Sequence, residues 1–470
     1  RRSSDLPYRG VNCGMAAGAL PGFRDFYPDE FALRAHIFRA WRSVARRYAF
    51  VEYDGPPLVP LDLYTKKSGD EIVGQLYNFV DKGGREVTLR PEMTPTFARM
   101  VAARANAIRK PVRWFSVPQL FRYERAQRGR LREHFQLNVD IVGEPSELAD
   151  AELLSVAIDI MREFGLGPDD VRARVSDRRL LNALLEEIGV AEAQLPTVYA
   201  VLDKFARQPH QVSIDKMAAA GLVPKTIDAV MSFGETGTLA DLRERFAHSG
   251  SLAPHFERLG RYLDHLHALG NGAWIDLDLT IVRGLAYYTG TVFELFDAKG
   301  ELRAICGGGR YDNLLHALGG VDLPALGFGM GDVVLGELLR ERGLVPASTG
   351  SAADVYIVGG DGVLAHGVTD ALVLARHLRR AGLSVDYALS ADKYVAQASR
   401  NQLDGARKSG ARAAIAFDSE DQVVVQGLFG KISEAPKHYF AAAPLLEGDA
   451  HAYAALKDWI DRSLPSRPTD

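Results

Sequence analysis

The sequence predicts an α+β protein in which helices flank an antiparallel sheet, followed by a separate α/β domain. Two observations carry this prediction. In the first part of the chain, strand-like runs adjacent in sequence are joined by tight turns such as the Lys-Gly-Gly at 82–84, which favours antiparallel pairing. After Pro346 the pattern changes to strand, helix, strand, helix, strand, which is typical of a mostly parallel core covered by helices.

The elements follow from the spacing of apolar residues. An amphipathic helix is predicted over 29–49, where apolar residues recur at helical spacing behind Pro28 and an acidic pair. Strand patterns and two shorter helices come next. The predicted strands are 50–53, 76–81, 86–89, 112–125 and 135–142, and the predicted helices are 94–107 and 145–164.

Between about 176 and 268 the pattern is almost wholly helical, which indicates an inserted helical module. The sheet resumes at Trp274 and ends in a glycine-rich strand and a helix over 325–339. In the last domain a helix is expected near 393–409, between the second and third strands.

The length allows two to four domains. Residues 1–14 begin without methionine and Met15 opens a new run, so we expect either a native start at Met15 or a disordered extension over 1–14, and we assign 1–19 to an N-terminal extension without fixed structure. We predict one domain over 20–345 that includes the insertion, a small-residue linker at 346–352, and a second domain over 353–470.

Composition excludes several classes of protein. No run of about 18 apolar residues and no signal-peptide pattern is present, so we predict neither a membrane span nor secretion, and a cytoplasmic location. Cys13 and Cys306 are too few for a disulfide framework and lack zinc-site spacing, so we predict no structural metal. The net charge of −4 means that a nucleic-acid partner would have to meet local basic patches.

The most informative stretch is FRYERAQRGRLREHFQ at 121–136. It contains no lysine but five arginines, which are Arg122, Arg125, Arg128, Arg130 and Arg132. Guanidinium groups bind phosphate oxygens with two parallel hydrogen bonds and stay charged near neutral pH. The stretch therefore indicates a site for a polyanion such as ATP or nucleic acid, although a solvated basic hairpin has the same composition.

Three further segments accompany it: TLRPEMTPTF at 88–97, TIVRGLAYYTGTVFEL at 280–295, and AICGGGRYDNLLHALGG at 304–320. In their order and internal spacing the four segments resemble the signature motifs of histidyl-tRNA synthetases, a class II aminoacyl-tRNA synthetase family. The similarity runs from about Leu20 to the end of the last domain. It implies a class II catalytic domain followed by an anticodon-binding domain.

The resemblance implies a histidine–tRNA ligase, which activates L-histidine with ATP to histidyl-adenylate and transfers the histidyl group to the 3′ end of tRNA(His). Mg²⁺ would accompany ATP as part of the substrate, and no tightly bound cofactor is expected. A homodimer is also implied, with Pro57 matching the first-motif proline at the dimer interface.

The resemblance further assigns roles to individual residues. Arg122 and Arg283 match the catalytic arginines that contact the α-phosphate and the substrate carboxylate. The ATP-binding set is Arg122, Arg130, Arg132 and Arg310. The histidine-binding set is Glu92 for the ammonium group with Thr94 beside it, Asp140 and Tyr288 for the imidazole, and Gln136 and Tyr287 lining the same pocket. Taken from the residues alone, a strand-edge salt bridge for Arg283 and core packing for the two tyrosines stay open.

The third motif departs from the family pattern. The glycine-rich strand at 327–331 should run into Glu-Arg, whose arginine contacts the γ-phosphate, but Val334 stands at that position. An aspartate of the family is also replaced by Ala286, and the expected glutamate at the ring-binding position is Asp140. We expect Arg130, Arg132 and Arg310 to compensate for the missing γ-phosphate contact.

Two other functions remain open at this point. One is a synthetase-like regulatory subunit of ATP phosphoribosyltransferase, which typically lacks a C-terminal anticodon-binding domain. The other is a synthetase paralogue that loads a non-tRNA acceptor, which the altered third motif allows. The α/β pattern that follows the linker favours the ligase over the regulatory subunit.

Overall fold

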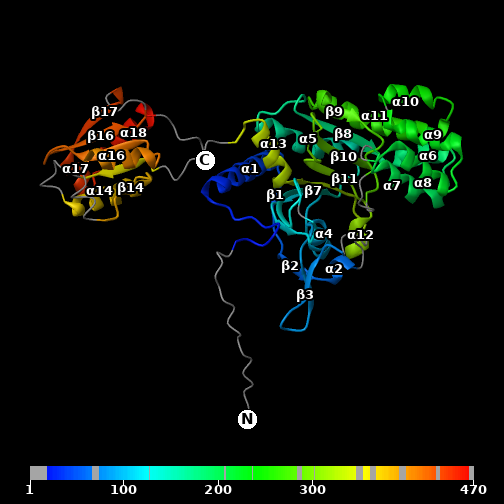
Figure 1. The fold of residues 1–470 in the computed structure, drawn as a ribbon, viewed down its shortest axis with the longest axis horizontal. Coiled ribbons are helices and arrows are strands. Elements are labelled where there is room, and N and C mark those ends of the chain that lie inside the picture. The colour runs from blue at the N-terminus through cyan, green and yellow to red at the C-terminus, as the bar shows by residue number, and fades with distance from the viewer. Residues whose placement is uncertain are drawn as a thin grey trace, which may run out of the picture. The chain divides into compact units, whose positions relative to one another are not determined.

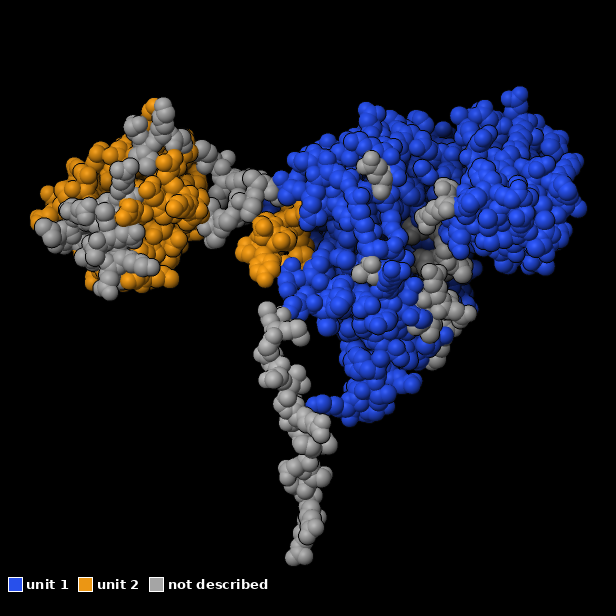
Figure 2. Space-filling view, in the orientation of Figure 1, with its two compact units in different colours: residues 1–25, 37–345 blue, residues 26–36, 346–470 orange. Residues whose placement is uncertain are grey.

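The computed structural model describes residues 18–65, 74–125, 127–205, 208–235, 237–282, 288–300, 302–345, 353–359, 367–390, 399–429 and 434–464. Its contacts define two compact units (Figure 2). Residues 1–25 and 37–345 form the first unit, and residues 26–36 and 346–470 form the second. The predicted linker at 346–352 and residues 1–17 of the predicted extension lie outside the described residues.

A nine-stranded sheet lies at the centre of the first unit (Figure 1). Its strands follow the order β1, β5, β7, β12, β11, β10, β8, β9, and β6 pairs with β7. The strands are β1 (Val51–Glu52), β5 (Val112–Ser116), β6 (Gln119–Phe121), β7 (Glu133–Val142), β8 (Val171–Asp177), β9 (Ile275–Leu277), β10 (Thr291–Asp297), β11 (Cys306–Arg310) and β12 (Ala325–Gly331). The predicted antiparallel pairing is confirmed inside this sheet, whereas the edge pairs β1–β5 and β8–β9 are parallel.

The single strand predicted over 112–125 is two strands, β5 and β6. The two are separated at Pro118, which has no N–H to donate to a neighbouring strand. A second, three-stranded sheet follows the order β2, β4, β3, of which β2 was not predicted because it is so short. Its strands are β2 (Leu58–Pro60), β3 (Tyr77–Val80) and β4 (Glu86–Leu89).

Helices pack against the large sheet. α5 contacts β7, β11 and β12, and α13 contacts β7 and β12. The helices outside the insertion are α1 (Pro28–Arg47), α2 (Asp62–Thr65), α4 (Thr94–Ala103), α5 (Glu147–Glu163), α12 (Leu314–Gly319) and α13 (Asp332–Glu341). On α1, the predicted amphipathic pattern buries Trp41 completely, and its indole nitrogen lies 3.3 Å from the sulfur of Met330 on β12.

The predicted helical insertion gathers beside β8 and β10 at one end of the sheet (Figure 1). Its helices are α6 (Arg178–Glu187), α7 (Leu195–Leu202), α8 (His210–Ala219), α9 (Pro224–Met231), α10 (Leu239–Arg245) and α11 (Ala253–Ala268). The predicted start at 176 was two residues early, because Ser176 and Asp177 still belong to β8. The Asp177 carboxylate accepts hydrogen bonds from the backbone N–H groups of Arg179 and Leu180, which begins the first helix of the insertion.

The second unit contains a five-stranded sheet in the order β14, β13, β15, β16, β17. The strands β14, β13 and β15 pair in parallel as predicted. Strands β16 and β17 add two antiparallel pairs, so the sheet is mixed, whereas a mostly parallel one was predicted. A short turn with a hydrogen bond from Asp418 N to Gln422 O joins β15 directly to β16, without a crossover helix. The elements are β13 (Val355–Val358), α14 (Val368–Arg380), β14 (Val385–Tyr387), α16 (Ser399–Lys408), β15 (Ala413–Phe417), β16 (Gln422–Gly427), β17 (Lys437–Ala441), α17 (Ala442–Glu447) and α18 (Ala450–Ser463).

Within the described parts of the chain, every helix is too short or too polar to serve as a membrane span.

Candidate active site

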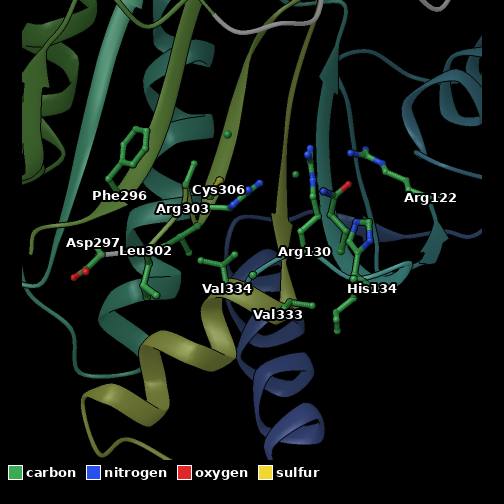
Figure 3. A pocket seen from close by; sticks show the side chains of 18 of the residues that line it. Arg122, Arg130, His134, Phe296, Asp297, Leu302, Arg303, Cys306, Val333 and Val334 are labelled. Atoms are coloured by element: carbon green, nitrogen blue, oxygen red, sulfur yellow. The ribbon is translucent and has the colours of Figure 1, made fainter. Parts of the chain in front are cut away.

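A cavity of about 690 Å³ opens on the large sheet of the first unit (Figure 3). One wall comes from the hairpin before β7 and from β7 itself, and the opposite wall comes from the segment that leads into β11. Glycines of β11 and β12 form part of the lining, and the first turn of α13 contributes Val333 and Val334. The cavity therefore joins two of the four segments that the sequence singled out, 121–136 and 304–320, with the glycine-rich strand and helix start at 327–334.

The glycines of β12 leave space for polar side chains of β7. A Cβ atom on Gly327 would lie 2.2 Å from Oδ1 of Asp140, and a Cβ atom on Gly329 would lie 2.8 Å from the amide of Gln136. Such distances are shorter than any real contact, so only glycine permits these side chains to occupy this face. Gln136 and Asp140 are four residues apart on one strand and therefore point to the same side of the sheet.

Four arginines line the cavity in the described structure, namely Arg122, Arg130, Arg174 and Arg303. Arg122 and Arg130 come from the predicted arginine-rich stretch, and Arg174 comes from β8. Figure 3 shows the nitrogen ends of Arg130 and Arg303 facing each other from opposite walls. This concentration of guanidinium groups suits a polyphosphate.

Three of these arginines have a protein partner. Nε of Arg122 donates to the carbonyl oxygen of Pro91 at 3.0 Å. Arg130 forms an ion pair with Glu124, and Arg174 lies 3.7 Å from the carboxylate of Asp278 and above the ring of Phe296. These contacts fix the direction of the side chains, and Figure 3 shows Arg122 and Arg130 reaching into the cavity.

Glu92 lies buried next to Arg122. Burial raises the pKa of the Glu92 carboxyl, and the charge of Arg122 acts against this rise. The backbone carbonyl of Glu92 accepts a hydrogen bond of 2.8 Å from the hydroxyl of Tyr64, which fixes this segment. A buried carboxylate with one cation beside it provides a suitable partner for a substrate ammonium group.

Asp140 is buried on the face of β7 that also carries Gln136. Burial raises the pKa of its carboxyl to about 7, although the hydrogen bond that Tyr311 donates to Oδ1 lowers it. Oδ2 of Asp140 is also buried and has no hydrogen-bond partner among the described residues. The ring of Tyr288 lies 6.5 Å from that of Tyr311, centre to centre, in an edge-on arrangement. A buried acceptor oxygen without a protein donor is suited to accept a hydrogen bond from a ligand.

The structure brings some predicted site residues together and leaves others outside. Arg122, Arg130 and Gln136 line the cavity. Glu92, Asp140 and Tyr288 are buried behind it, and Thr94 begins α4 directly after the Glu92 segment. Arg283, Tyr287 and Ala286 lie outside the described residues. Pro57 is exposed, and its carbonyl accepts a hydrogen bond from the backbone N–H of Arg90.

Arg132 does not belong to the cavity lining. Its guanidinium lies 4.4 Å above the ring of Tyr123, and Nε donates to the carbonyl of Glu124 at 3.0 Å. The expectation that Arg132 contacts ATP therefore finds no support in this arrangement.

Arg310 is also outside the cavity and is almost completely buried. It pairs with both carboxylate oxygens of Asp150 on α5, at 2.9–3.2 Å, and donates to the carbonyls of Glu144 and Ser146. These contacts tie β11 to the start of α5. Arg310 therefore holds these two elements together, and its surroundings do not support the expected contact with ATP.

We expect Arg310→Met to lower the stability of the first unit by about 3–5 kcal/mol, because it leaves the Asp150 carboxylate buried without its cation. Arg258→Met is the matched control, since Arg258 pairs with Glu147 of the same helix but is more exposed and shares this acid with Arg261. Its effect should stay below about 1 kcal/mol. Thermal unfolding of the full chain measures both, and equal melting temperatures for the two variants would contradict the prediction.

A buried ionic network holds the walls of the cavity in place. Asp332, the first residue of α13, accepts hydrogen bonds from the backbone N–H of Phe135 and from Arg24, both at 2.9 Å. Arg24 also donates to Glu133 at 2.6 Å, and Glu133 accepts a further hydrogen bond from Gln119. The network joins the N-terminal segment, β6, β7 and α13. It therefore fixes the arginine-rich hairpin before β7 relative to the start of α13, which carries the third motif.

Arg174, Arg303 and His134 are among the residues of the lining that sequence reasoning missed. Arg174 alternates with buried residues along β8, and this alternation was the available signal for a polar face. Burial and the nearby charges of Arg122, Arg24 and Arg130 lower the pKa of His134 to about 3, so its imidazole is neutral at physiological pH. No local signal marked Arg303, because it lies in the loop before the glycine run.

The family model described as histidyl-tRNA synthetase matches residues 22–331 of this chain. The histidine–tRNA ligase of Opitutus terrae is 46% identical over 409 residues, which cover 86% of this chain and 91% of that protein. The histidine–tRNA ligase of Leptospira biflexa is 38% identical over 408 residues, which cover 86% of this chain and 90% of that protein.

Solved structures agree on the fold. The crystal structure of histidyl-tRNA synthetase from Nostoc sp. PCC 7120 superimposes with a TM-score of 0.74 at 22% identity, covering 93% of this chain and 99% of that one. A Bacillus halodurans structure described as an ATP phosphoribosyltransferase regulatory subunit/histidyl-tRNA synthetase gives a TM-score of 0.65 at 22% identity, covering 79% of this chain and 92% of that one. These neighbours show the fold alone, which the ligase and the regulatory subunit share.

Proposed function

Because this chain belongs to the histidyl-tRNA synthetase family, we propose that it is a histidine–tRNA ligase that uses the arginine-lined cavity as its active site. The observation that carries the proposal is an arginine-lined cavity beside two buried carboxyl groups: Glu92 lies next to Arg122 of the lining, and Asp140 lies on the face of β7 that carries Gln136 of the lining. The cavity suits the phosphates of ATP, and the two carboxyl groups suit the ammonium group and imidazole ring of histidine.

The first step joins the two substrates. A carboxylate oxygen of histidine attacks the α-phosphorus of ATP, the bond to the bridging oxygen breaks, and pyrophosphate leaves with its Mg²⁺. We assign to Arg122, which lines the cavity, the role of holding the α-phosphate and stabilising the charge that develops on it. In the second step a ribose hydroxyl at the 3′ end of tRNA(His) attacks the acyl carbon, and AMP leaves.

The pocket selects histidine by hydrogen bonds that other side chains cannot make, rather than by the volume of the pocket. We assign Asp140 as the acceptor for an imidazole N–H, which its buried Oδ2 supports, and Tyr288 and Gln136 as the residues that complete the pocket. A side chain without a ring N–H leaves Oδ2 of Asp140 buried without a hydrogen-bond donor, which rejects that side chain strongly. A separate editing step is then unnecessary.

The proposal also assigns roles to the second unit and to residues outside the cavity. The second unit would bind the anticodon of tRNA(His), and the exposed Pro57 would lie at the interface of a homodimer. Arg283 and Tyr287 keep their expected roles at the carboxylate and in the histidine pocket. We place the enzyme in the cytoplasm, where tRNA is charged for protein synthesis.

The test is histidine-dependent exchange of labelled pyrophosphate into ATP by the purified full chain, followed by charging of total tRNA. The ligase predicts both reactions with histidine and neither with the other amino acids. Exchange without charging would identify a paralogue with another acceptor. Histidine binding without exchange would identify a regulatory subunit, and either result would overturn the ligase.

A further inference from the structure

Arg303 and Val334 lie side by side in the cavity. A Cβ atom placed on Gly129 would be 3.4 Å from Cγ2 of Val334 and 3.7 Å from Cδ of Arg303. The aliphatic part of Arg303 therefore passes beside the valine that stands where the family's third motif has an arginine. Arg303 reaches this place from the loop before β11, whereas Val334 belongs to the first turn of α13.

Arg303 differs from the other three arginines of the cavity, because among the described residues it has no hydrogen-bond or ion-pair partner. Arg122, Arg130 and Arg174 each make a hydrogen bond or an ion pair. Arg303 makes neither with any residue that the structure describes. A guanidinium group placed in a cavity without a partner retains all five of its donors for a ligand.

The acidic residues of the lining do not neutralise Arg303. Glu124 pairs with Arg130, and Asp297 pairs with Arg342 at 2.5 Å behind the cavity wall. Figure 3 shows the guanidinium of Arg303 pointing across the cavity toward that of Arg130. Arg303 therefore adds to the cavity a positive charge that neither Glu124 nor Asp297 of the lining pairs with, which favours an anion beside it.

We propose that Arg303 binds the outer phosphates of ATP, opposite Arg130, and supplies the positive charge that Val334 lacks. The proposal rests on the proposed function for the identity of the nucleotide. It replaces the expectation that Arg132 and Arg310 compensate, because both lie outside the cavity and are engaged elsewhere.

Arg303→Met tests the proposal in the full chain, because methionine keeps an unbranched stem beside Val334 and removes the charge. Arg340→Met is the matched control, since Arg340 is an exposed arginine on α13 outside the cavity lining. The measurements are equilibrium binding of ATP and of AMP, and the KM values for ATP and histidine in pyrophosphate exchange.

We expect R303M to weaken ATP binding by about 10- to 100-fold, the loss expected for one charge-assisted contact, and R340M to leave it unchanged. AMP binding and the KM for histidine should stay within about twofold of the wild type, because neither ligand carries the outer phosphates. Unchanged ATP binding in R303M would overturn the proposal. A parallel loss of ATP and AMP binding would also overturn it, since Arg303 would then not act at the outer phosphates.

The same experiment separates this proposal from the proposed function. A wild-type protein that binds ATP but shows no histidine-dependent exchange would refute the ligase, while a selective loss of ATP binding in R303M would still support the phosphate contact. Normal exchange in the wild type together with unchanged ATP binding in R303M would refute only the role of Arg303.

Discussion

Replacing Arg122 with alanine is expected to lower the rate of adenylate formation by about 10²–10³-fold, the range found when one oriented donor is removed from a site of developing charge. Arg122 lines the cavity and is oriented by its hydrogen bond to the carbonyl of Pro91. The loss should appear mainly in kcat, because the charge on the α-phosphate is largest in the transition state. Single-turnover formation of histidyl-adenylate measures it directly.

The variant has a second consequence at Glu92. The charge of Arg122 opposes the rise in the pKa of the Glu92 carboxyl, so its removal raises this pKa further. Glu92 then holds its proton at higher pH and binds an ammonium group less well, which should raise the KM for histidine.

Arg125→Ala is the matched control for Arg122. It removes an exposed arginine of the same stretch that does not line the cavity, so adenylate formation should stay within about twofold of the wild type. Arg122→Lys keeps the charge but not the planar fork, and an intermediate rate is expected. Equal rates for R122A and R125A would rule out the assigned role of Arg122.

Asp140→Asn should raise the KM for histidine by about 100-fold or more, because the imidazole loses a charged acceptor in a buried site. The shape of the side chain is conserved, so the contact with Gly327 does not change. Asp322→Asn provides the control, since Asp322 is an aspartate on the surface that is 87% exposed. A KM for histidine that is the same in D140N and in the wild type would exclude Asp140 from the ring-binding site.

Asp140 also predicts a pH dependence of stability. Burial raises its pKa to about 7 in the folded protein, so the folded state holds a proton that the unfolded chain has already lost above about pH 4. Stability of the free protein should therefore fall as the pH rises from 4 to 7, in contrast to an aspartate whose pKa is lowered on folding. Melting curves of the wild type and D140N between pH 5 and pH 8 measure the difference. If Asp140 titrates as predicted, the D140N curves change less with pH.

The fold class and one wall of the cavity were predictable because their signals are local. Arg122, Arg130 and Gln136 lie close together in sequence, on one hairpin and the strand that follows it. Proximity in the chain is then nearly proximity in space. The edge pairings of the large sheet involve β1 and β9, which are two and three residues long and leave little periodic pattern. Strands β16 and β17 are six and five residues long, but the predicted pattern of the last domain ended at its third strand.

The remaining site residues depend on partners that are distant in the chain. Arg310 was expected at the nucleotide, but it meets Asp150, which lies 160 positions earlier and satisfies its charge in the core. Arg132 was assigned to ATP from its place in the hairpin, but the ring of Tyr123 holds it outside the cavity. Arg174 and Arg303 reach the cavity only when β8 and β11 join the sheet, so the alternation along β8 marks Arg174 as polar-facing without placing it at the cavity, and no local pattern identifies Arg303.

The link from Arg24 to Glu133 and Asp332 bears on the design of shortened variants of this protein. A variant that starts after residue 24 would lack the cation shared by two acids that are nearly inaccessible to solvent. In such a protein Glu133 and Asp332 would be buried without a cation or would have to be protonated. The start of α13, which carries the altered third motif, would lose its ion pair with Arg24. The stretch just ahead of the first helix is therefore an integral part of the catalytic machinery, and shortening the chain there should impair adenylation as well as folding.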